Sequence, residues 1–287
     1  MTSVDALPRL RRRSTVLVAG RLPYVLSALL VVVAAVAALF SFAFPSLLRG
    51  APVATGNMRG TSLAILMVGL PVLVTAIVRA AHGSTSAVVV WLGTLAYLLY
   101  QSVLFCFAIP LNNLFLVYVA YLGLCVWSLV TLLLCVDLAA FGLRLSPRMP
   151  AKRLAGVALT LVVLNAYAWL AQIVPAMFTS DPGILLQDTG LLTNPVFVQD
   201  LAIWLPLLTA AAIASWNRKP WGLLVTGAML TMFVLESISI ATDQWFGSQA
   251  DPTSPSASMA AVPAFAVVAV ITALPLGWYV RYLGGDE

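Results

Sequence analysis

Two acidic residues occupy matching positions in adjacent apolar stretches of the chain. Asp200 lies sixteen residues before Trp216, and Glu236 lies sixteen residues after Pro220, with only residues 217–219 between the two stretches. Helices joined by so short a turn run antiparallel and side by side. At 1.5 Å per residue, both carboxyl groups would lie about 24 Å from that turn. Two carboxyl groups that meet in a low-dielectric environment share a proton, so the spacing predicts a proton-sensitive pair.

Amide and hydroxyl side chains fall near the same height on other apolar stretches. Gln101 would lie about 22 Å and Gln172 about 27 Å along its helix, measured from the same side. Asn165 shares a helical face with Gln172, because it precedes that residue by seven positions. Asn113 lies just after the turn that follows the span of Gln101, and Tyr121 lies on the next expected helix. We therefore expect an outward-opening cleft lined by amide and aromatic groups, with the two acids at its floor.

The same polar groups have a purely structural interpretation. Lipid offers no hydrogen bonds, so an amide or acid within an apolar span must face protein, water or a ligand. Amides that join neighbouring helices contribute about 1 kcal/mol each or less. An acid deep in a span costs about 2.5 kcal/mol or more unless it is paired or protonated, which makes Glu236 the hardest of these residues to explain by packing alone.

The composition identifies the class of protein in which these groups lie. Of 287 residues, 62% are hydrophobic and 9% are charged, whereas soluble domains are roughly 45–50% apolar and about 25% charged. Runs of about 20 apolar residues match the thickness of a bilayer. Eight such runs predict an all-α polytopic integral membrane protein, at 22–44, 61–80, 86–109, 112–136, 154–177, 195–216, 220–246 and 260–282.

The basic residues predict the orientation of these spans. With the N-terminus inside, 13 of the 15 Lys and Arg residues fall in cytoplasmic segments, and only Arg49 and Arg59 fall outside. Because positive charge favours the cytoplasmic side, the distribution predicts that both termini are cytoplasmic. It also accounts for the net charge of +5 without a nucleic-acid partner.

Arg59 is the exception that could take part in chemistry. It precedes the second expected span on the outer side, in the sequence NMRGTSLAI. It could pair with Glu236 or Asp200, or it could bind an anionic group of a substrate or lipid. A solvated or snorkelling arginine is the alternative that involves no site.

The rest of the chain predicts a single transmembrane domain, 1–287. Residues 1–21 form a basic cytoplasmic segment, and 178–194 and 247–259 form extracytoplasmic loops. Spans two and three resemble spans six and seven in placing a basic turn before a Trp and a Gly, which suggests an internal repeat. Aligned on those residues, Gln101 and Glu236 fall at different offsets.

Several kinds of chemistry lack the residues they require. The one histidine, His82, is in an expected cytoplasmic turn, and the three cysteines have no C-x-x-C spacing, so no metal site or haem is predicted. No phosphate-binding or dinucleotide-binding glycine motif is present. We therefore expect no cofactor, and the sequence identifies no catalytic residue.

Five motifs carry a resemblance to known proteins. They are RGTSLAI (59–65), YLLY (97–100), NNLFLVYVAYLGL (112–124), NPVFVQDLAIWLP (194–206) and RKPWG (218–222). Over residues 59–222 the chain resembles a family of uncharacterised bacterial polytopic membrane proteins. The resemblance implies a multi-span protein of the bacterial inner (plasma) membrane, in contact with membrane lipids, and implies no mechanism.

Three functions are compatible with this sequence. The first is a small proton-sensitive transporter or ligand-binding protein, in which Glu236 and Asp200 titrate while Arg59 and the amides orient a small molecule or lipid. The second is an intramembrane enzyme that acts on a lipid or isoprenoid, with one acid as general base. The third is a scaffold or sensor subunit without chemistry, whose polar layer only joins helices.

Overall fold

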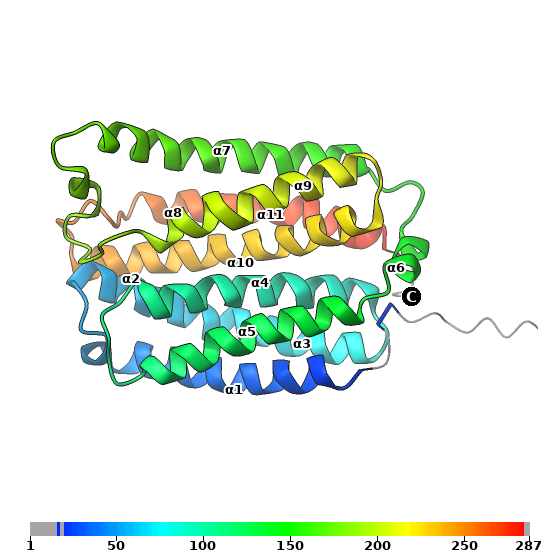
Figure 1. The fold of residues 1–287 in the computed structure, drawn as a ribbon, viewed down its shortest axis with the longest axis horizontal. Helices are drawn as coiled ribbons and strands as arrows, with labels where there is room; N and C mark the ends of the chain where they lie inside the picture. Colours follow the sequence, from blue (N-terminus) through cyan, green and yellow to red (C-terminus); the bar gives the residue numbers. More distant parts are fainter. Residues whose placement is uncertain (1–15, 18–19, 284–287) are drawn as a thin grey trace, which may run out of the picture.

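The computed structural model describes residues 16–17 and 20–283, and shows a bundle of helices that run roughly parallel to one long axis (Figure 1). Within this part of the chain, eight helical segments are long and apolar enough to cross a membrane. They are α1 (Leu22–Ala43), α2 to α3 (Pro52–Ala81), α4 (Thr85–Phe107), α5 (Phe115–Cys135), α7 (Ala151–Met177), α8 to α9 (Pro195–Trp216), α10 (Pro220–Ala250) and α11 (Ala261–Arg281). The expected all-α fold with eight spans is confirmed for the described residues, among which no β-strand occurs.

Two of the spans are not regular α-helices throughout. The second consists of α2 (Pro52–Ala64), a π-helical segment (Ile65–Gly69) and α3 (Leu70–Ala81). The sixth consists of α8 (Pro195–Gln199), a π-helical segment (Asp200–Trp204) and α9 (Leu205–Trp216). Each π-helical segment is followed by Leu-Pro. Proline has no N–H to donate and its ring displaces the carbonyl four residues earlier, so the helix widens just before it.

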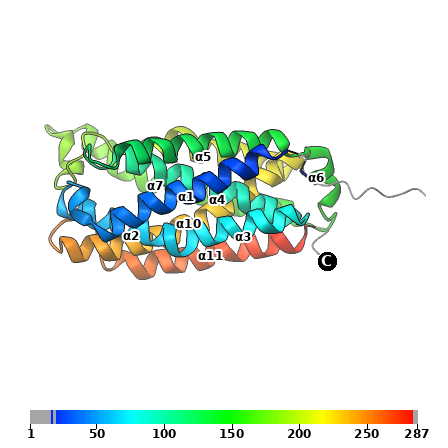
Figure 2. The same cartoon turned by 90° about the horizontal axis from the view of Figure 1, so that it is seen from below.

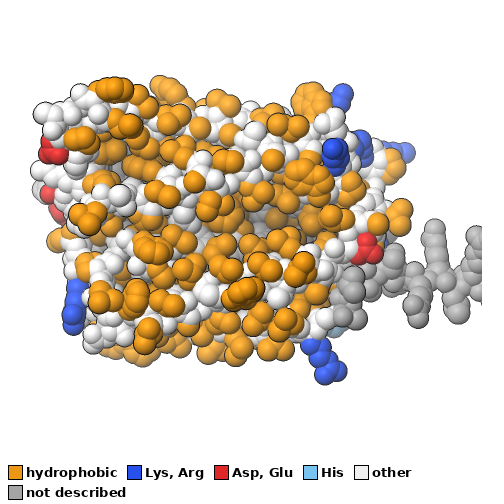
Figure 3. Space-filling view, in the orientation of Figure 1, with side chains coloured by type: hydrophobic (Ala, Val, Ile, Leu, Met, Phe, Trp, Pro, Cys, Tyr) orange, Lys and Arg blue, Asp and Glu red, His pale blue; other side chains and the backbone are white. Residues whose placement is uncertain are grey.

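The two ends of the bundle carry opposite charge. Figure 3 shows an apolar surface along the length of the molecule, with Lys and Arg gathered at one end and acidic side chains mainly at the other. The described chain begins and ends at the basic end, where the short α6 (Leu138–Arg144) lies (Figure 1). There Val16 accepts a hydrogen bond from the Asp137 amide, at 2.8 Å, and Tyr282 accepts one from the Ser146 amide, at 3.0 Å. Residues 1–15, which form most of the expected basic segment, lie outside the described residues.

The structure moves two expected boundaries. The second span begins at Pro52, nine residues before the predicted start, so Arg59 lies within a helix and not in a loop. The seventh span continues to Ala250, so the first residues of the predicted loop 247–259 are helical. Both errors have one cause: the polar ends of these helices pack against each other, so hydropathy alone truncates them. Beyond α10, Asp251 accepts hydrogen bonds from Thr253, which lower the pKa of its carboxyl.

Glycines allow α2 and α10 to approach closely. A Cβ at Gly56 would lie 2.6 Å from the carbonyl oxygen of Phe246, and one at Gly60 would overlap the carbonyl of Thr242. The Thr242 hydroxyl donates to the Gly60 carbonyl at 3.0 Å. Such small residues are typical of tightly packed transmembrane helices, because they let the backbones approach.

A constant spacing of 135 residues relates the second and third spans to the sixth and seventh. Residues 135 positions apart match in local structure. The π-helical segment Ile65–Gly69 matches Asp200–Trp204, and the turn residue Gly83 (φ 91°) matches Arg218 (φ 54°). The first residue of α4 likewise matches that of α10. Gln101 and Glu236 are separated by the same 135 residues. Aligned on this spacing, Gln101 and Glu236 occupy matching positions, which they do not when the spans are aligned on Trp and Gly.

The α2–α10 contact predicts the effect of a bulkier residue. Gly60→Val should lower the free energy of unfolding by about 1–3 kcal/mol, because the added methyl groups must force the two backbones apart. Gly123→Ala is the matched control, since a Cβ at Gly123 meets nothing within 4 Å. It should leave stability unchanged or slightly raised. Unfolding by SDS titration in mixed micelles measures both, and equal losses would contradict the prediction.

Candidate functional site

Gln101 and Glu236 form a direct hydrogen bond in the interior of the bundle. The amide nitrogen Nε2 of Gln101, on α4, donates to Oε2 of Glu236, on α10, at 2.6 Å. The same nitrogen lies 3.5 Å from Oγ of Ser239, one turn further along α10. Gln101 is only 1% exposed, and Glu236 is half-buried. Figures 1 and 2 both place α4 and α10 in the middle of the bundle, and these are its most buried spans.

Close packing of α4 against α10, nearer the basic end, brings the Gln101 and Glu236 side chains together. A Cβ at Gly93 of α4 would overlap the Ala228 carbonyl of α10. Gln101 lies eight residues after Gly93 and Glu236 eight after Ala228, which is just over two turns on each helix. Because α4 and α10 run in the same direction from the basic end, the two side chains reach the same height.

Asp200 is held by a different set of donors. It is the first residue of the second π-helical segment and is 7% exposed. Its Oδ2 accepts a hydrogen bond from Nε1 of Trp169, on α7, at 2.7 Å. The hydroxyl of Tyr100, on α4, interacts with the same carboxyl. Trp169 is itself packed against Phe197, with ring centroids 5.0 Å apart.

The two acids therefore do not form the expected carboxyl pair. They are near enough to interact electrostatically, but each has its own donors and no hydrogen bond joins them. The reason lies in α4, where Tyr100 and Gln101 are consecutive and project about 100° apart. Tyr100 faces Asp200 and Gln101 faces Glu236, so α4 supplies a separate donor to each acid.

Two buried polar atoms around Glu236 have no hydrogen-bond partner within the described part of the chain, Oε1 of Gln101 and the hydroxyl group of Tyr121. The hydroxyl group of Tyr97, also buried there, interacts with Ser239. Both tyrosines lie within electrostatic range of the Glu236 carboxyl, and both are at most 1% exposed. Buried polar atoms are normally satisfied. A cluster of unsatisfied ones beside an acid can donate to or accept from a bound molecule.

The two π-helical segments both contact this part of α4. Gly69, which ends the first segment, faces Tyr97, whose ring carbon would lie 2.9 Å from a Cβ at that position. Asp200, which begins the second, faces Tyr100. Single π-helical turns occur frequently at functional sites, because they displace a side chain from its regular position.

Three of the residues expected in the cleft lie elsewhere. Asn113 is exposed in the connection between α4 and α5. Gln172 is also exposed, and its amide donates to the Ala168 carbonyl of its own helix at 2.8 Å. Arg59 forms no ion pair with Asp200 or Glu236. Asn165 is half-buried one turn before Trp169, with an unpartnered Oδ1.

The structure adds residues that the sequence argument did not select. Tyr97 precedes Gln101 by one helical turn, and Ser239 follows Glu236 by three residues, so each shares a face with a predicted site residue. Tyr100 is adjacent to Gln101, and Trp169 lies between the two amides of its span. These four residues could have been identified from the sequence, because their spacing along the helices places them close to the predicted site residues.

No protein-family model, curated protein or solved structure matches this chain. Within the described ranges, no three His, Cys, Asp or Glu side chains gather as metal ligands. The site offers one half-buried carboxyl, one buried carboxyl, an amide and three phenolic hydroxyls.

The hydrogen bond between Gln101 and Glu236 predicts a strong coupling between these residues. Gln101→Leu should lower the free energy of unfolding by about 1–3 kcal/mol, because the Glu236 carboxyl loses its donor. Replacing both residues with Leu should recover most of that loss, since no unpaired polar group remains. Unfolding of the purified variants in SDS titrations measures this.

Gln172→Leu is the matched control, because its side chain is exposed and bonds only to its own helix. It should change the free energy of unfolding by no more than about 0.5 kcal/mol. A double variant as unstable as Gln101→Leu alone would show that the bond does not couple the two helices.

Proposed function

We propose that this chain is a small proton-sensitive transporter of the bacterial inner membrane, which binds a small cationic or polar molecule beside Glu236. The observation that carries the proposal is the Gln101–Glu236 pair, at the contact between two corresponding spans and beside unpartnered buried polar atoms. The assignment to bacteria relies on the five family-like motifs. The orientation, with both termini cytoplasmic, relies on the charge of the two ends.

The charge around the two acids favours a proton or a cation as one of the species bound. Throughout the described residues, no Lys, Arg or His lies within ion-pair distance of Glu236 or Asp200. Their donors are a neutral amide, an indole and a phenol. An ionised carboxyl in such surroundings is costly unless positive charge accompanies it. Binding of a proton or a cationic group supplies that charge, and its release restores the starting state.

The arrangement of the spans favours transport over a static packing role. Many secondary transporters consist of two structural repeats, with the binding site near the bilayer midplane where the repeats meet. Interrupted helices at corresponding positions of the two halves are a common mark of such sites. Here the interruptions at Ile65–Gly69 and Asp200–Trp204 correspond, and Gln101 and Glu236 meet at the contact.

The proposed orientation predicts the result of reporter fusions. A fluorescent protein fused after Glu287 should fold and fluoresce in bacterial cells, because it remains in the cytoplasm, whereas alkaline phosphatase fused there should be inactive. Alkaline phosphatase inserted at Asp188, in the loop between α7 and α8, should be active. The opposite pattern would reverse the orientation.

The site predicts that flux depends on Glu236. Purified protein in vesicles that contain a pH-sensitive dye should couple an imposed gradient of Na⁺, K⁺ or methylammonium to a change in internal pH. Glu236→Gln should reduce this signal to that of empty vesicles, because the amide can neither carry a proton nor neutralise a cation. Gln101→Glu should alter the pH profile, since it adds a second carboxyl at the same contact.

The matched control is Asp188→Asn, an exposed acid whose positive φ of 69° is one that asparagine tolerates. It should retain the flux of the unmodified protein. An unchanged pH profile in Glu236→Gln would reject the site. Absence of flux with a precursor lipid accumulating in a deletion strain would favour the intramembrane enzyme, and a polar layer that tolerates alanine would favour the scaffold.

A further inference from the structure

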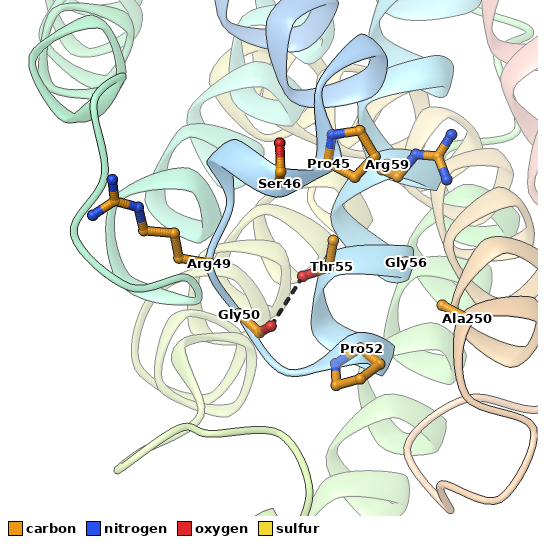
Figure 4. A pocket seen from close by; sticks show the side chains of 9 residues that line it. All are labelled: Pro45, Ser46, Arg49, Gly50, Pro52, Thr55, Gly56, Arg59 and Ala250. Atoms are coloured by element: carbon orange, nitrogen blue, oxygen red, sulfur yellow. Dashed lines mark hydrogen bonds between the residues drawn. The ribbon is translucent and has the colours of Figure 1, made fainter.

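A second polar feature lies at the acidic end, away from the two acids. A hollow of about 400 Å³ is open to the surface where the connection from α1 meets the start of α2 (Figure 4). Its lining residues are Pro45, Ser46, Arg49, Gly50, Pro52, Thr55, Gly56, Arg59 and Ala250. The lining has two arginines and no acidic residue. It therefore carries positive charge at the end of the molecule that is otherwise acidic.

Arg59 is held rigidly at the edge of this hollow. Its guanidinium carbon lies 5.5 Å from the centre of the Phe42 ring and 5.4 Å from that of Phe246. Its Nε donates to the Phe42 carbonyl at 3.3 Å. The two ring centres are 5.9 Å apart, so both rings lie on the same side of the guanidinium and attract it by cation–π interactions. The two terminal nitrogens have no acceptor among the residues the structure describes, so the forked end of the guanidinium is available.

The start of α2 adds to the attraction for an anion. Pro52, Thr55, Gly56 and Arg59 follow helical spacing and line one side of the hollow. The first turn has no side-chain cap, and the N-terminus of a helix carries partial positive charge. Its contribution here is that of the helix dipole, because Pro52 has no N–H and the Thr55 N–H donates to the Ala51 carbonyl at 2.9 Å. Arg49, whose φ is 55°, lies at the opposite edge, and its guanidinium points away from Arg59 (Figure 4).

We propose that this hollow binds a phosphate-bearing anion, with Arg59 as the principal donor and Arg49 as a second positive charge. The forked guanidinium matches the spacing of two phosphate oxygens, and helix N-termini commonly bind phosphate. Of the three roles that the sequence allowed for Arg59, pairing with Asp200 or Glu236 does not occur, which leaves binding of an anionic group and a solvated or snorkelling arginine. The site lies where the apolar surface ends, at the depth of lipid headgroups, so an anionic phospholipid and free phosphate are the two sources.

The test measures the binding of these two sources by the purified full-length chain in neutral detergent. Short-chain phosphatidylglycerol, short-chain phosphatidylcholine and inorganic phosphate are each titrated while thermal unfolding is followed. Phosphatidylglycerol should raise the unfolding temperature and phosphatidylcholine should not, because its choline cancels the charge. Stabilisation by inorganic phosphate as well would identify a free anion as the ligand. Stabilisation by neither anion would overturn the proposal.

Two arginine variants and one control locate the effect. Arg59→Lys keeps the charge but loses the forked geometry, and should weaken binding at least about tenfold. Arg49→Gln should weaken binding without changing the unfolding temperature of the ligand-free protein, because Arg49 is exposed. Arg79→Gln removes the same charge at the basic end of the same span and should bind as tightly as the unmodified chain. Binding unaffected by both Arg59→Lys and Arg49→Gln, or lost equally in Arg79→Gln, would reject the site.

Discussion

Hydrocarbon offers no hydrogen-bond partner, and this constraint governs where every polar side chain of this bundle lies. The two most buried spans, α4 and α10, carry Gln101 and Glu236 at one height, and the Gln101 amide donates a hydrogen bond to the Glu236 carboxyl at 2.6 Å. Turned toward lipid, either side chain would cost the bundle several kcal/mol. The pair therefore fixes the register and rotation of the central helices, and the other spans pack around them.

Other polar contacts between spans show what purely structural pairs look like here. Ser27 accepts a hydrogen bond from Trp91, Ser41 pairs with Tyr118, and Ser215 pairs with Thr226, at 2.9–3.1 Å. Each joins two neutral groups. The surroundings of Glu236 differ in kind, because they combine a carboxyl with hydroxyl and amide atoms that remain unpartnered. This contrast separates a site from the hydrogen bonds that hold helices together.

The sequence predicted the number of spans, and it placed Glu236 and Gln101 inside the bundle at similar heights, because both follow from the cost of polar groups in lipid. It placed the start of α2 and the end of α10 too close to the membrane centre, since their polar residues face each other and not water. It also paired Asp200 with Glu236 on height alone. Height follows from residue count, but the direction of a side chain depends on local helix geometry. The π-helical turn at Asp200 rotates that residue toward Tyr100 and Trp169, which residue counting could not predict.

The separation of the two acids has a consequence for the proposed chemistry. A directly bonded carboxyl pair titrates as a unit, so that one proton serves both groups. Here Tyr100 and Gln101, consecutive on one rigid helix, keep each carboxyl with its own neutral donors. One acid can then change its charge while the other keeps its hydrogen bonds, and the two remain coupled only through space. One acid could then hold a proton while the other holds a ligand, which a pair that shares one proton would not allow. A change at either carboxyl would reach the other acid through α4.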